Sequence, residues 1–380
     1  MKTLKILSIF GTRPEATKMI PLHLALSTHP QIQASICITA QHRQLLDQVL
    51  HPFNITPQYD LNIMSAGQTL FDITSRVLTG LRDVLCDAKP DLLLVHGDTT
   101  TTFAASLAAF YSQVRLGHVE AGLRSYDKHQ PYPEEMNRKL TTSMADLHFA
   151  PTKDARDKLL KENVAQSSIY VTGNTAIDMM KYTVNPQHIF LSNTLNNLDY
   201  SKKIILMTAH RRENLGQPME NICRAVARIV DDFPDTLLVW PVHPNPAVTK
   251  PAHTFLAGNE RVVLVDPLDV RDLHNLMGRV HLVLTDSGGL QEEAPTLNKP
   301  VIVLRDVTER PEGLAAGTLA LAGTDEDRIY KAVANLMTDN QTYQMMANTP
   351  NPFGDGNASK RIVDFILHDF RLLQERPLEF

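Results

Sequence analysis

The fold is most clearly indicated by the stretch Leu282-Val-Leu-Thr-Asp-Ser-Gly-Gly-Leu-Gln-Glu-Glu-Ala-Pro295. An apolar run typical of a buried strand ends at Thr285, and Ser287-Gly288-Gly289 then leads directly into a segment with helical composition. Backbone N–H groups at the start of a helix are unpaired and lie at the positive end of its dipole, so they can bind phosphate. Glycines allow the phosphate to approach the backbone closely.

The acidic residue Glu293 lies one helical turn after Gly289 in the same stretch. We expect it to face the phosphate site, where its carboxylate can accept hydrogen bonds from ribose hydroxyls. The alternative is a strand–turn–helix junction with no ligand, because short glycine motifs also occur by chance. The rest of the chain must decide between these interpretations.

Length and composition indicate a globular protein of two domains. A chain of 380 residues favours two domains, each with its own core. Hydrophobic content of 43% and charged content of 21% are ordinary for a soluble enzyme. The net charge is −5 and the basic residues are scattered singly, which argues against a nucleic-acid or membrane-surface partner.

The cysteines and the N-terminus indicate a cytoplasmic protein. Cys37, Cys86 and Cys223 are far apart and form no C-x-x-C motif, which favours reduced thiols. The apolar run within Met1–Phe10 is too short for a signal peptide and is expected to be a buried strand. Apolar runs elsewhere fall short of the roughly 18 residues that a membrane-spanning helix needs.

Short apolar runs alternate with amphipathic segments along the whole chain. The expected strands are Leu4–Phe10, Ile32–Thr39, Asp91–His96, Arg115–Val119, Ile169–Thr172, Lys203–Thr208, Thr236–Val242, Arg261–Val265, His281–Thr285 and Pro300–Leu304. The expected helices between them include Thr99–Tyr111, Glu134–Ala145, Met219–Asp232 and Gly289–Leu297. Strands rich in Val, Ile and Leu that alternate with helices predict parallel sheets covered on both faces. The predicted fold class is therefore α/β, with two doubly wound parallel sheets.

A weak segment separates the two expected sheets. Val184–Tyr200 is rich in Asn and lacks clear periodicity. We therefore expect one Rossmann-like domain at residues 1–175 and a second at 176–360, with a C-terminal helix at 361–380. The segment Ala358–Leu373 is amphipathic, and we expect it to pack back on the first domain.

The loop after the first strand carries two cations. Gly11-Thr-Arg-Pro-Glu-Ala-Thr-Lys18 follows that strand, and ligands of parallel sheets bind beyond the carboxyl ends of strands. Arg13 and Lys18 suit a diphosphate. The alternative is a capped helix start with Pro14 in its first turn. The chain contains neither G-x-G-x-x-G nor G-x-x-x-x-G-K-[ST], which argues against a nicotinamide dinucleotide site and a P-loop.

Three carboxylates stand at expected strand ends or helix starts of the first half. Asp98 follows one strand, Glu120 follows the next, and Glu134 begins a helix on which Arg138 shares its face. The alternatives are a helix cap for Asp98 and a surface ion pair between Glu134 and Arg138, worth a few tenths of a kcal/mol. Such carboxylates can act as acid and base if burial and mutual repulsion separate their pKa values.

Cations and histidines gather at strand ends of the second half. His210, Arg211, His243 and Arg310 all follow expected strands there. The sequence has no H-E-x-x-H spacing, so we expect no metal, and no G-x-S-x-G, which argues against a serine hydrolase. The sequence thus predicts a phosphate-binding half and a carboxylate half on either side of a cleft.

Five motifs together resemble one enzyme family. In chain order they are Gly11-Thr-Arg-Pro-Glu-Ala-Thr-Lys18, His118-Val-Glu-Ala-Gly-Leu-Arg124, Pro133-Glu-Glu-Met-Asn-Arg138, His210-Arg-Arg-Glu213 and Asp286-Ser-Gly-Gly-Leu-Gln-Glu-Glu293. The set resembles the bacterial non-hydrolysing UDP-N-acetylglucosamine 2-epimerases over nearly the whole chain. The resemblance implies a GT-B-like fold of two Rossmann-like domains around a deep cleft, and a homodimer. It also implies interconversion of UDP-GlcNAc and UDP-ManNAc without a redox cofactor, which would supply ManNAc-type sugars for surface polysaccharide.

The resemblance also implies roles for individual residues. The positions that match the family's catalytic residues are Asp98, Glu120, Glu134, Arg138 and His210. Those that match its UDP-binding residues are Arg13, Lys18, His210, Ser287, Gly288, Gly289, Glu293 and Arg310, with Arg211 and His243 near the diphosphate. Gln41, His42 and Gln44 match a segment that binds a second UDP-GlcNAc as an activator in some members. Those members also have an arginine before Gln68-Thr69-Leu70, and here Ser65-Ala66-Gly67 has none.

The implied mechanism is elimination of UDP through 2-acetamidoglucal, followed by re-addition after protonation of C2 from the opposite face. A hydrolysing relative that releases ManNAc and UDP is an alternative. A GT-B glycosyltransferase and a catalytically inactive UDP-sugar sensor are further alternatives. A modified UDP-HexNAc, such as a uronate or a 6-deoxy sugar, is an alternative substrate.

Overall fold

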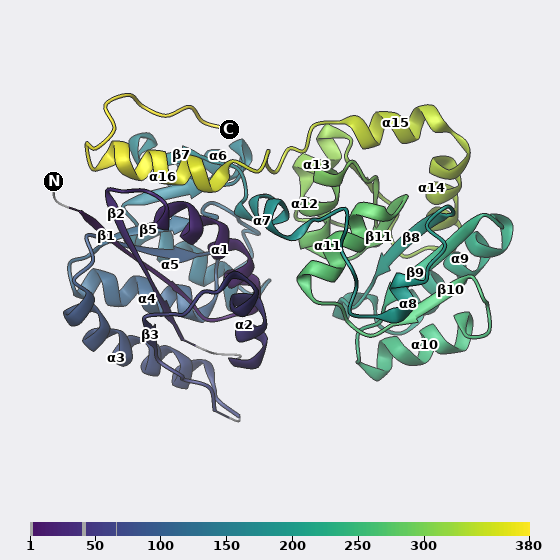
Figure 1. The fold of residues 1–380 in the computed structure, drawn as a ribbon, viewed down its shortest axis with the longest axis horizontal. Coiled ribbons are helices and arrows are strands. Elements are labelled where there is room, and N and C mark those ends of the chain that lie inside the picture. The colour runs from purple at the N-terminus through teal and green to yellow at the C-terminus, as the bar shows by residue number, and fades with distance from the viewer. Residues whose placement is uncertain (1–2, 40–42, 66) are drawn as a thin grey trace. The chain divides into compact units, whose positions relative to one another are not determined.

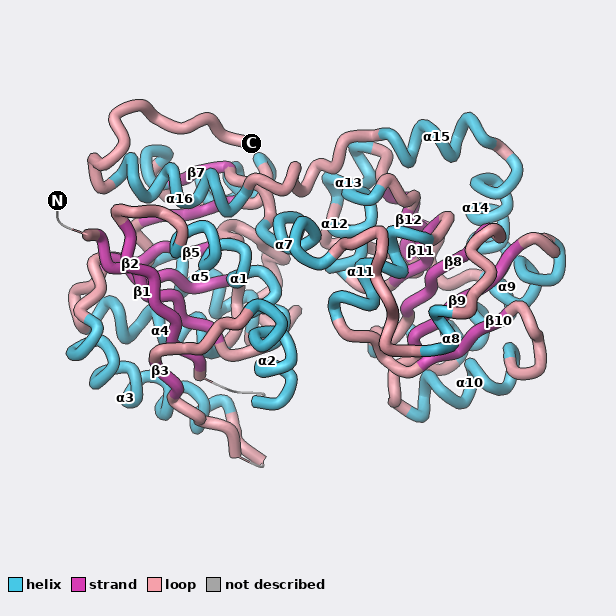
Figure 2. Tube along the Cα trace, viewed as in Figure 1, coloured by secondary structure: helices cyan, strands magenta, loops and turns pink. Residues whose placement is uncertain are grey.

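The computed structural model describes residues 3–39, 43–65 and 67–380 (Figure 1). It divides into two compact units. The N-terminal unit comprises Met1–Met179 and Gly354–Phe380, and the C-terminal unit comprises Met180–Phe353. Each unit is built around one parallel sheet with helices packed against it (Figure 2).

The N-terminal unit contains a parallel sheet whose described strands run in the order β3-β2-β1-β4-β5-β6-β7. These strands are β1 Leu4–Phe10, β2 Ile32–Ile38, β3 Tyr59–Asp60, β4 Leu92–His96, β5 Arg115–Val119, β6 Leu147–Ala150 and β7 Ile169–Val171. The helices are α1 Arg13–Ser27, α2 Arg43–Leu50, α3 Leu70–Ala88, α4 Thr100–Tyr111, α5 Glu134–Met144, α6 Lys153–Lys161 and α16 Ala358–Asp369. Helix α7 Thr175–Thr183 begins in this unit and ends in the C-terminal unit. The order reverses between β1 and β4, as in a doubly wound fold.

Both faces of this sheet are buried because successive side chains of a strand point to opposite faces. On β1, Ile6 and Phe10 join a core with residues of α1 and α16, whereas Leu7 and Ile9 join a second core with residues of α3 and α4. The near-continuous apolar run of β1 therefore has a partner layer on each side. This is why the run reads as a strand without polar alternation.

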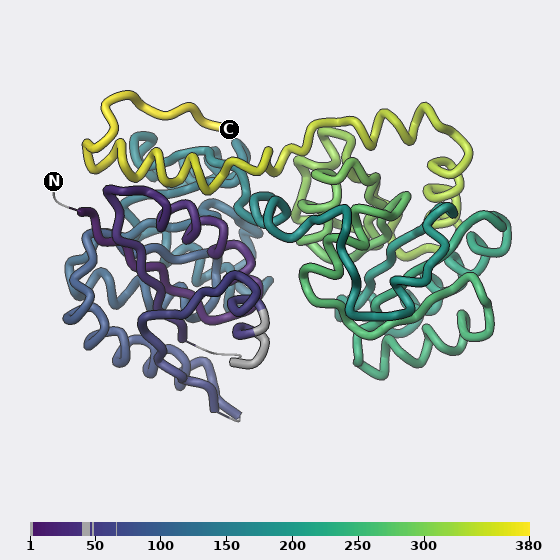
Figure 3. Tube along the Cα trace, viewed as in Figure 1, coloured from purple at the N-terminus to yellow at the C-terminus, as the bar shows by residue number. Residues whose placement is uncertain are grey.

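The C-terminal helix α16 packs within the N-terminal unit, beside α1 (Figure 3). Its fully buried Phe365 lies with its ring centroid 4.4 Å from that of Tyr170. The buried Asp178 carboxylate accepts hydrogen bonds from the backbone N–H groups of Ala358 (3.1 Å) and Ser359 (2.7 Å). This carboxylate satisfies donors at the helix start that would otherwise be unpaired.

The C-terminal unit contains a second parallel sheet, with its described strands in the order β10-β9-β8-β11-β12-β13. The strands are β8 Lys203–Thr208, β9 Thr236–Pro241, β10 Val262–Val265, β11 Leu282–Thr285, β12 Val301–Val303 and β13 Leu319–Leu321. The helices are α8 Asn193–Asn196, α9 Gln217–Asp232, α10 Pro246–Leu256, α11 Val270–Arg279, α12 Gly288–Glu293, α13 Pro311–Ala316, α14 Glu326–Thr338 and α15 Asn340–Asn348. Short 3₁₀ turns lie at His51–Phe53, Gln166–Ser168, Arg212–Asn214 and Ala294–Leu297.

The expected α/β class with two doubly wound parallel sheets is confirmed. Three strands were not expected from the sequence: β3, β6 and β13. They have two to four residues each, too few for a recognisable pattern, and they form because an existing neighbour offers a parallel edge. In the described part of the chain, no helix is both long and apolar enough to cross a membrane.

Candidate active site

The loop after β1 is fixed by the buried side chain of Glu15. Its carboxylate accepts hydrogen bonds from the backbone N–H groups of Gly11 (3.0 Å) and Thr12 (2.8 Å), and from the Thr99 hydroxyl (2.7 Å) at the start of α4. Burial raises the pKa of Glu15, and these hydrogen bonds oppose that shift. The capped helix start considered for this loop is therefore present as a capping box. Glu15 joins the ends of β1 and β4.

Three side chains converge on the carboxylate of Glu120, directly after β5. Lys18 forms an ion pair with Glu120 Oε1, and Asn174 Nδ2 donates a 3.1 Å hydrogen bond to the same oxygen. His96 Nε2 lies 3.4 Å from Glu120 Oε2. The Glu120 side chain is only 8% exposed, so the ion pair acts in a region of low dielectric. Lys18, expected on a diphosphate, instead contacts a candidate catalytic carboxylate in this structure.

The backbone around Glu120 adopts conformations that most residues avoid. Glu120 has a φ of 63°, in the left-handed region that is uncommon outside glycine. Two residues later Gly122 has a φ of 93°, and a Cβ added there would lie 2.3 Å from the carbonyl oxygen of Ala155. Unfavourable backbone conformations of this kind persist where the surroundings hold them, and they cluster at functional sites.

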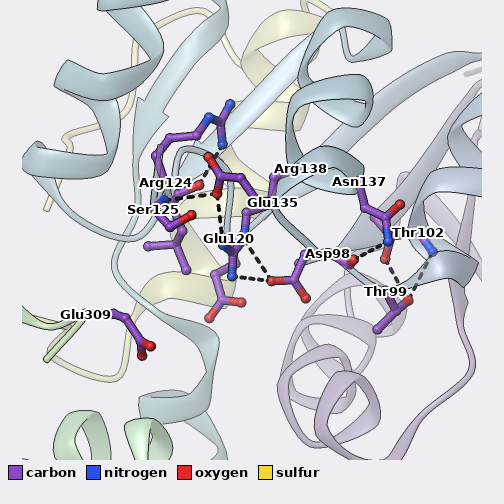
Figure 4. A network of polar contacts seen from close by, with 12 residues as sticks. Asp98, Thr99, Thr102, Glu120, Arg124, Ser125, Glu135, Asn137, Arg138 and Glu309 are labelled. Carbon is purple, nitrogen blue, oxygen red and sulfur yellow. Dashed lines mark hydrogen bonds and ion pairs between the residues drawn. The ribbon is translucent and has the colours of Figure 1, made fainter. Parts of the chain in front are cut away.

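Arg138 on α5 holds Asp98, directly after β4 (Figure 4). Its Nη2 and Nε lie 2.6 and 2.8 Å from Asp98 Oδ2, and Asn137 Nδ2 donates to the Asp98 carbonyl (2.9 Å). Arg138 Nη1 also donates to Glu135 Oε2 (3.2 Å). The surface ion pair considered for Glu134 and Arg138 is wrong, because the guanidinium turns to Asp98 and Glu135.

The neighbouring residues Glu134 and Glu135 differ in their surroundings. Glu135 is fully buried and accepts hydrogen bonds from the backbone N–H groups of Ser125 (2.9 Å) and Tyr126 (3.1 Å). Burial raises the pKa of Glu135, but these bonds and Arg138 outweigh it and lower the pKa overall. Glu134 Oε2 is a buried atom with no hydrogen-bond partner among the described residues. Glu135 therefore shapes the loop, whereas Glu134 offers an oxygen to a ligand.

Two buried histidines lie at the same edge of the N-terminal sheet. His118 Nε2 lies 2.7 Å from the carbonyl oxygen of Gly97, and burial lowers the His118 pKa to about 3. Burial also lowers the pKa of His96 to about 4, against the opposing effect of Glu120. Both imidazoles are therefore neutral at physiological pH.

The C-terminal unit presents the Ser287-Gly288-Gly289 turn between β11 and α12. The preceding residue, Asp286, is fully buried. Its Oδ2 accepts from the backbone N–H groups of His210 and Arg211, both at 2.8 Å, and from Asn214 Nδ2 at 3.0 Å. Asp286 thus fixes the loop after β8 against the end of β11, which brings His210 and Arg211 to the turn.

Two arginines lie beside Gly288. A Cβ added at Gly288 would lie 3.4 Å from Nη2 of Arg310 and 3.8 Å from Nη2 of Arg211. Arg310 is oriented by an ion pair with the buried Glu292. The turn, Arg211 and Arg310 therefore lie together in an arrangement suited to a phosphate, which we call the cradle.

The other predicted ligands of this unit lie at the same sheet edge. The rings of His210 and His243 are both exposed, with centroids 5.7 Å apart. Glu293 Oε1 lies 3.7 Å from the position that a Cβ would take at Gly289, so this carboxylate faces the turn as expected. The structure therefore brings His210, Arg211, His243, Ser287, Gly288, Gly289, Glu293 and Arg310 to one edge of the C-terminal sheet.

Some predicted features lie beyond what the structure describes. Gln41 and His42, two of the three candidate activator ligands, lie outside the described residues, and Gln44 is placed only as part of α2. Arg13 begins α1, after the loop fixed by Glu15. Among the described residues, no group of three or more His, Cys, Asp and Glu side chains could hold a metal ion.

Three supporting residues were not assigned from the sequence. His96 and Asn174 contact Glu120, and Asp286 anchors the loop of His210. The only available signal was position, since each follows or ends a strand of a parallel sheet. Their roles depend on which neighbouring loop each side chain reaches, and that is a tertiary property.

Known proteins match the whole chain. A family model described as UDP-N-acetylglucosamine 2-epimerase matches residues 24–367. A Bacillus subtilis UDP-N-acetylglucosamine 2-epimerase is 55% identical over 380 residues, covering 100% of this chain and 99% of the relative. A Staphylococcus aureus protein, MnaA, solved with UDP, is 53% identical with a TM-score of 0.90 and 100% coverage of both chains. A Neisseria meningitidis UDP-GlcNAc 2-epimerase bound to UDP-GlcNAc is 47% identical with a TM-score of 0.87, covering 96% of this chain and all of the other.

A protein of much lower sequence identity shares the fold. A glycosyltransferase of kitacinnamycin shares the architecture at 11% identity and a TM-score of 0.65, which supports the GT-B-like fold and nothing more. The family, in contrast, is shown by the family model and by relatives that match end to end. The chain belongs to the UDP-N-acetylglucosamine 2-epimerase family.

Proposed function

We propose that this protein interconverts UDP-GlcNAc and UDP-ManNAc by inverting C2 of the sugar without consuming water. The observation that carries the proposal is the Glu120 carboxylate, held by Lys18 and Asn174 in a buried position beside His96. The relatives from S. aureus and N. meningitidis, solved with UDP and UDP-GlcNAc, support this substrate class.

The chemistry requires the loss of UDP before C2 can be inverted, because the C2 hydrogen is not adjacent to a carbonyl. In the first step the C1–O bond to UDP breaks and a base takes the proton from C2, giving 2-acetamidoglucal and UDP. In the second step an acid returns a proton to the opposite face of C2, and UDP oxygen attacks C1. No electron leaves the system, and neither water nor a redox cofactor takes part.

The two units supply different parts of this reaction. We assign the acid and base to Asp98, Glu120 and Glu134, with Arg138 orienting Asp98. We assign the departing diphosphate to the cradle and His210, because preorganised donors stabilise a leaving group most effectively. The N-terminal unit would thus serve as the catalytic domain and the C-terminal unit as the UDP-binding domain, with bounds close to the expected 1–175 and 176–360.

The two intermediates must not leave the enzyme between the two steps. If 2-acetamidoglucal or UDP escaped, the enzyme would waste its substrate, so both must stay bound through the second step. We further propose ribose recognition by Glu293, and contacts of Arg13 and His243 with the diphosphate. The product would supply ManNAc-type sugars for surface polysaccharide.

We also propose that two copies assemble in the cytoplasm. Neighbouring helices α3 and α4 expose large apolar side chains, with Phe71 88%, Phe110 63% and Tyr111 68% exposed. Exposed apolar surface of this kind is typical of protein–protein interfaces. The three cysteines are free thiols, as is usual in a reducing compartment.

The decisive experiment follows deuterium from solvent. Purified protein incubated with UDP-GlcNAc in deuterated water should give UDP-ManNAc, and also recovered UDP-GlcNAc, with deuterium at C2. Both follow because the C2 proton is exchanged while the intermediate is bound. NMR of the sugar region reads position and extent of labelling.

Two other results would redirect the assignment. Free ManNAc with stoichiometric UDP would identify a hydrolysing enzyme, and transfer of the sugar only when an acceptor is added would identify a glycosyltransferase. UDP binding without exchange at C2 would leave a sensor and reject the catalytic proposal.

A further inference from the structure

In the C-terminal unit, the buried side chains of Thr183 and His274 form a series of contacts that ends at Glu293. Thr183, the last residue of α7, has its Oγ1 2.7 Å from His274 Nδ1, and His274 Nε2 lies 3.3 Å from Glu293 Oε2. Thr183 is 4% exposed, and the His274 side chain is 1% exposed. The histidine is thus enclosed, with one ring nitrogen on a hydroxyl and the other facing a carboxylate.

The two ring nitrogens of His274 face different partners. Nδ1 lies at hydrogen-bond distance from the Thr183 hydroxyl, and the tautomer of the ring decides which of the two atoms donates. Nε2 lies within ion-pair distance of the Glu293 carboxylate, whose oxygens accept hydrogen bonds. Partners that contact a ligand-binding side chain from the protein interior orient it in this way.

The first member of this series is itself held in place. Asn275 on α11 donates from Nδ2 to the carbonyl of Thr183 (2.7 Å) and to that of Arg271 (2.8 Å). The Asn275 amide oxygen accepts from the backbone N–H of Asn185 (2.7 Å). The end of α7 and the start of the next segment are therefore tied to α11, so Thr183 has little freedom to move.

The two oxygens of Glu293 face different groups. Oε2 is the oxygen nearest His274, whereas Oε1 lies 3.7 Å from the Cβ position of Gly289, on the side of the Ser287-Gly288-Gly289 turn. The Glu293 side chain is 12% exposed. One face of the carboxylate is thus fixed from behind while the other is presented at the turn.

We propose that Thr183 and His274 are positioning residues that orient Glu293 for the ribose hydroxyls of a uridine nucleotide. The inference rests on the proposed function, since it takes Glu293 as a ribose ligand. It adds that the contacts behind Glu293 set the preference for a ribonucleotide over its 2′-deoxy counterpart. A preoriented carboxylate loses less conformational freedom when the hydroxyls bind.

The test compares UDP and 2′-deoxy-UDP by calorimetry, with the full-length protein. In His274→Ala the dissociation constant for UDP should rise about tenfold, the effect of one charge-assisted hydrogen bond, while that for 2′-deoxy-UDP rises only about twofold. Thr183→Val keeps the shape and removes the hydroxyl, and should lose part of the same discrimination. The ratio of the two affinities is decisive, because general loosening of the fold would weaken both ligands equally.

His281→Gln serves as the matched control, because His281 is in the same unit and stacks on Tyr343 with a centroid separation of 4.2 Å. It should leave the ratio of the two affinities unchanged. A His274→Ala protein that binds UDP with undiminished preference over 2′-deoxy-UDP would overturn the inference. If the unsubstituted protein binds UDP tightly but shows no exchange at C2, the proposed function fails while this inference stands.

Discussion

The polar side chains at the two sheet edges differ in how far they are already partnered by other side chains. In the N-terminal unit two of the three candidate carboxylates are already partnered, Glu120 by Lys18 and Asp98 by Arg138. In the C-terminal unit the rings of His210 and His243 are exposed, and the buried carboxylate of Asp286 holds the loop after β8. Under the proposed function, the first edge would transfer protons and the second would present donors to the diphosphate.

This difference suggests that substitutions at the two edges should separate catalysis from binding. Changes at the N-terminal edge should lower kcat with UDP affinity retained, and changes at the C-terminal edge should do the reverse. Each of the following substitutions is a way to break that distinction.

The largest effect is expected from Glu120→Gln. It keeps the size of the side chain but removes one of the three proposed acid–base groups, so interconversion should fall about a thousandfold. Turnover by NMR and UDP affinity by calorimetry should diverge, with affinity close to that of the unsubstituted protein. The exposed Glu375→Gln is the matched control. Near-normal turnover in Glu120→Gln would remove Glu120 from the reaction.

Lys18 tests the comparison most directly, since the sequence places it on the diphosphate and the structure places it on Glu120. If it acts through Glu120, Lys18→Met should lower kcat about a hundredfold and leave the UDP dissociation constant unchanged. Lys18→Arg keeps the charge and should recover part of the rate. A weakened affinity for UDP with kcat intact would instead assign Lys18 to the diphosphate.

Gly288→Ala tests the cradle. The added Cβ would lie 3.4 Å from Arg310 Nη2 and would occupy the surface that a phosphate approaches. We expect the UDP dissociation constant to rise about tenfold, the equivalent of one strong hydrogen bond, with kcat at saturation nearly unchanged. Gly278→Ala, where a Cβ meets only an ordinary contact with Leu297, is the control. Equal UDP affinities in both variants would reject the cradle.

The last comparison concerns stability, where no loss of activity is expected at neutral pH. Burial lowers the pKa of His118 from 6.5 to about 3, so the folded state binds fewer protons than the unfolded state between these values. The contribution of His118 to the free energy of unfolding therefore keeps its full value above pH 6.5. It falls as the pH is lowered towards 3, by at most about 1.4 kcal/mol per pH unit. His118→Gln should therefore show a shallower acid decline in hydrogen-exchange protection of β4 and β5. An unchanged slope would show that His118 is not neutral in the folded state.

Much of the fold could be predicted because buried parallel strands have their own pattern. Leu4–Phe10, Arg115–Val119 and Lys203–Thr208 coincide with β1, β5 and β8. Continuous apolar runs predict such strands, since both faces of the sheet are covered. The strand β6 was missed, because Leu147–Ala150 is short and contains a histidine, and it is a strand only by pairing with β5 and β7.

The sequence could predict which residues lie at the candidate site, but not which of their side chains contact one another. Strand ends located Asp98, Glu120 and the Ser287–Gly289 turn, because parallel strands bring their carboxyl ends to one edge. The ion pair considered between Glu134 and Arg138 rested on their spacing of four positions on one helix. In the folded chain Arg138 instead contacts Asp98, which follows β4. A long cation turns to the carboxylate whose geometry and burial make the strongest pair.

The sequence by itself therefore determined the two sheets, the cationic turn and the carboxylates at strand ends, because local periodicity and topology are written along the chain. Only the tertiary structure decided that Lys18 contacts Glu120, that Asp286 holds the loop of His210, and that His274 stands behind Glu293. His210 and Asp286 are 76 positions apart in the sequence, and Lys18 and Glu120 are 102 positions apart. Their strength comes from burial and geometry, which exist only after the strands have been brought together.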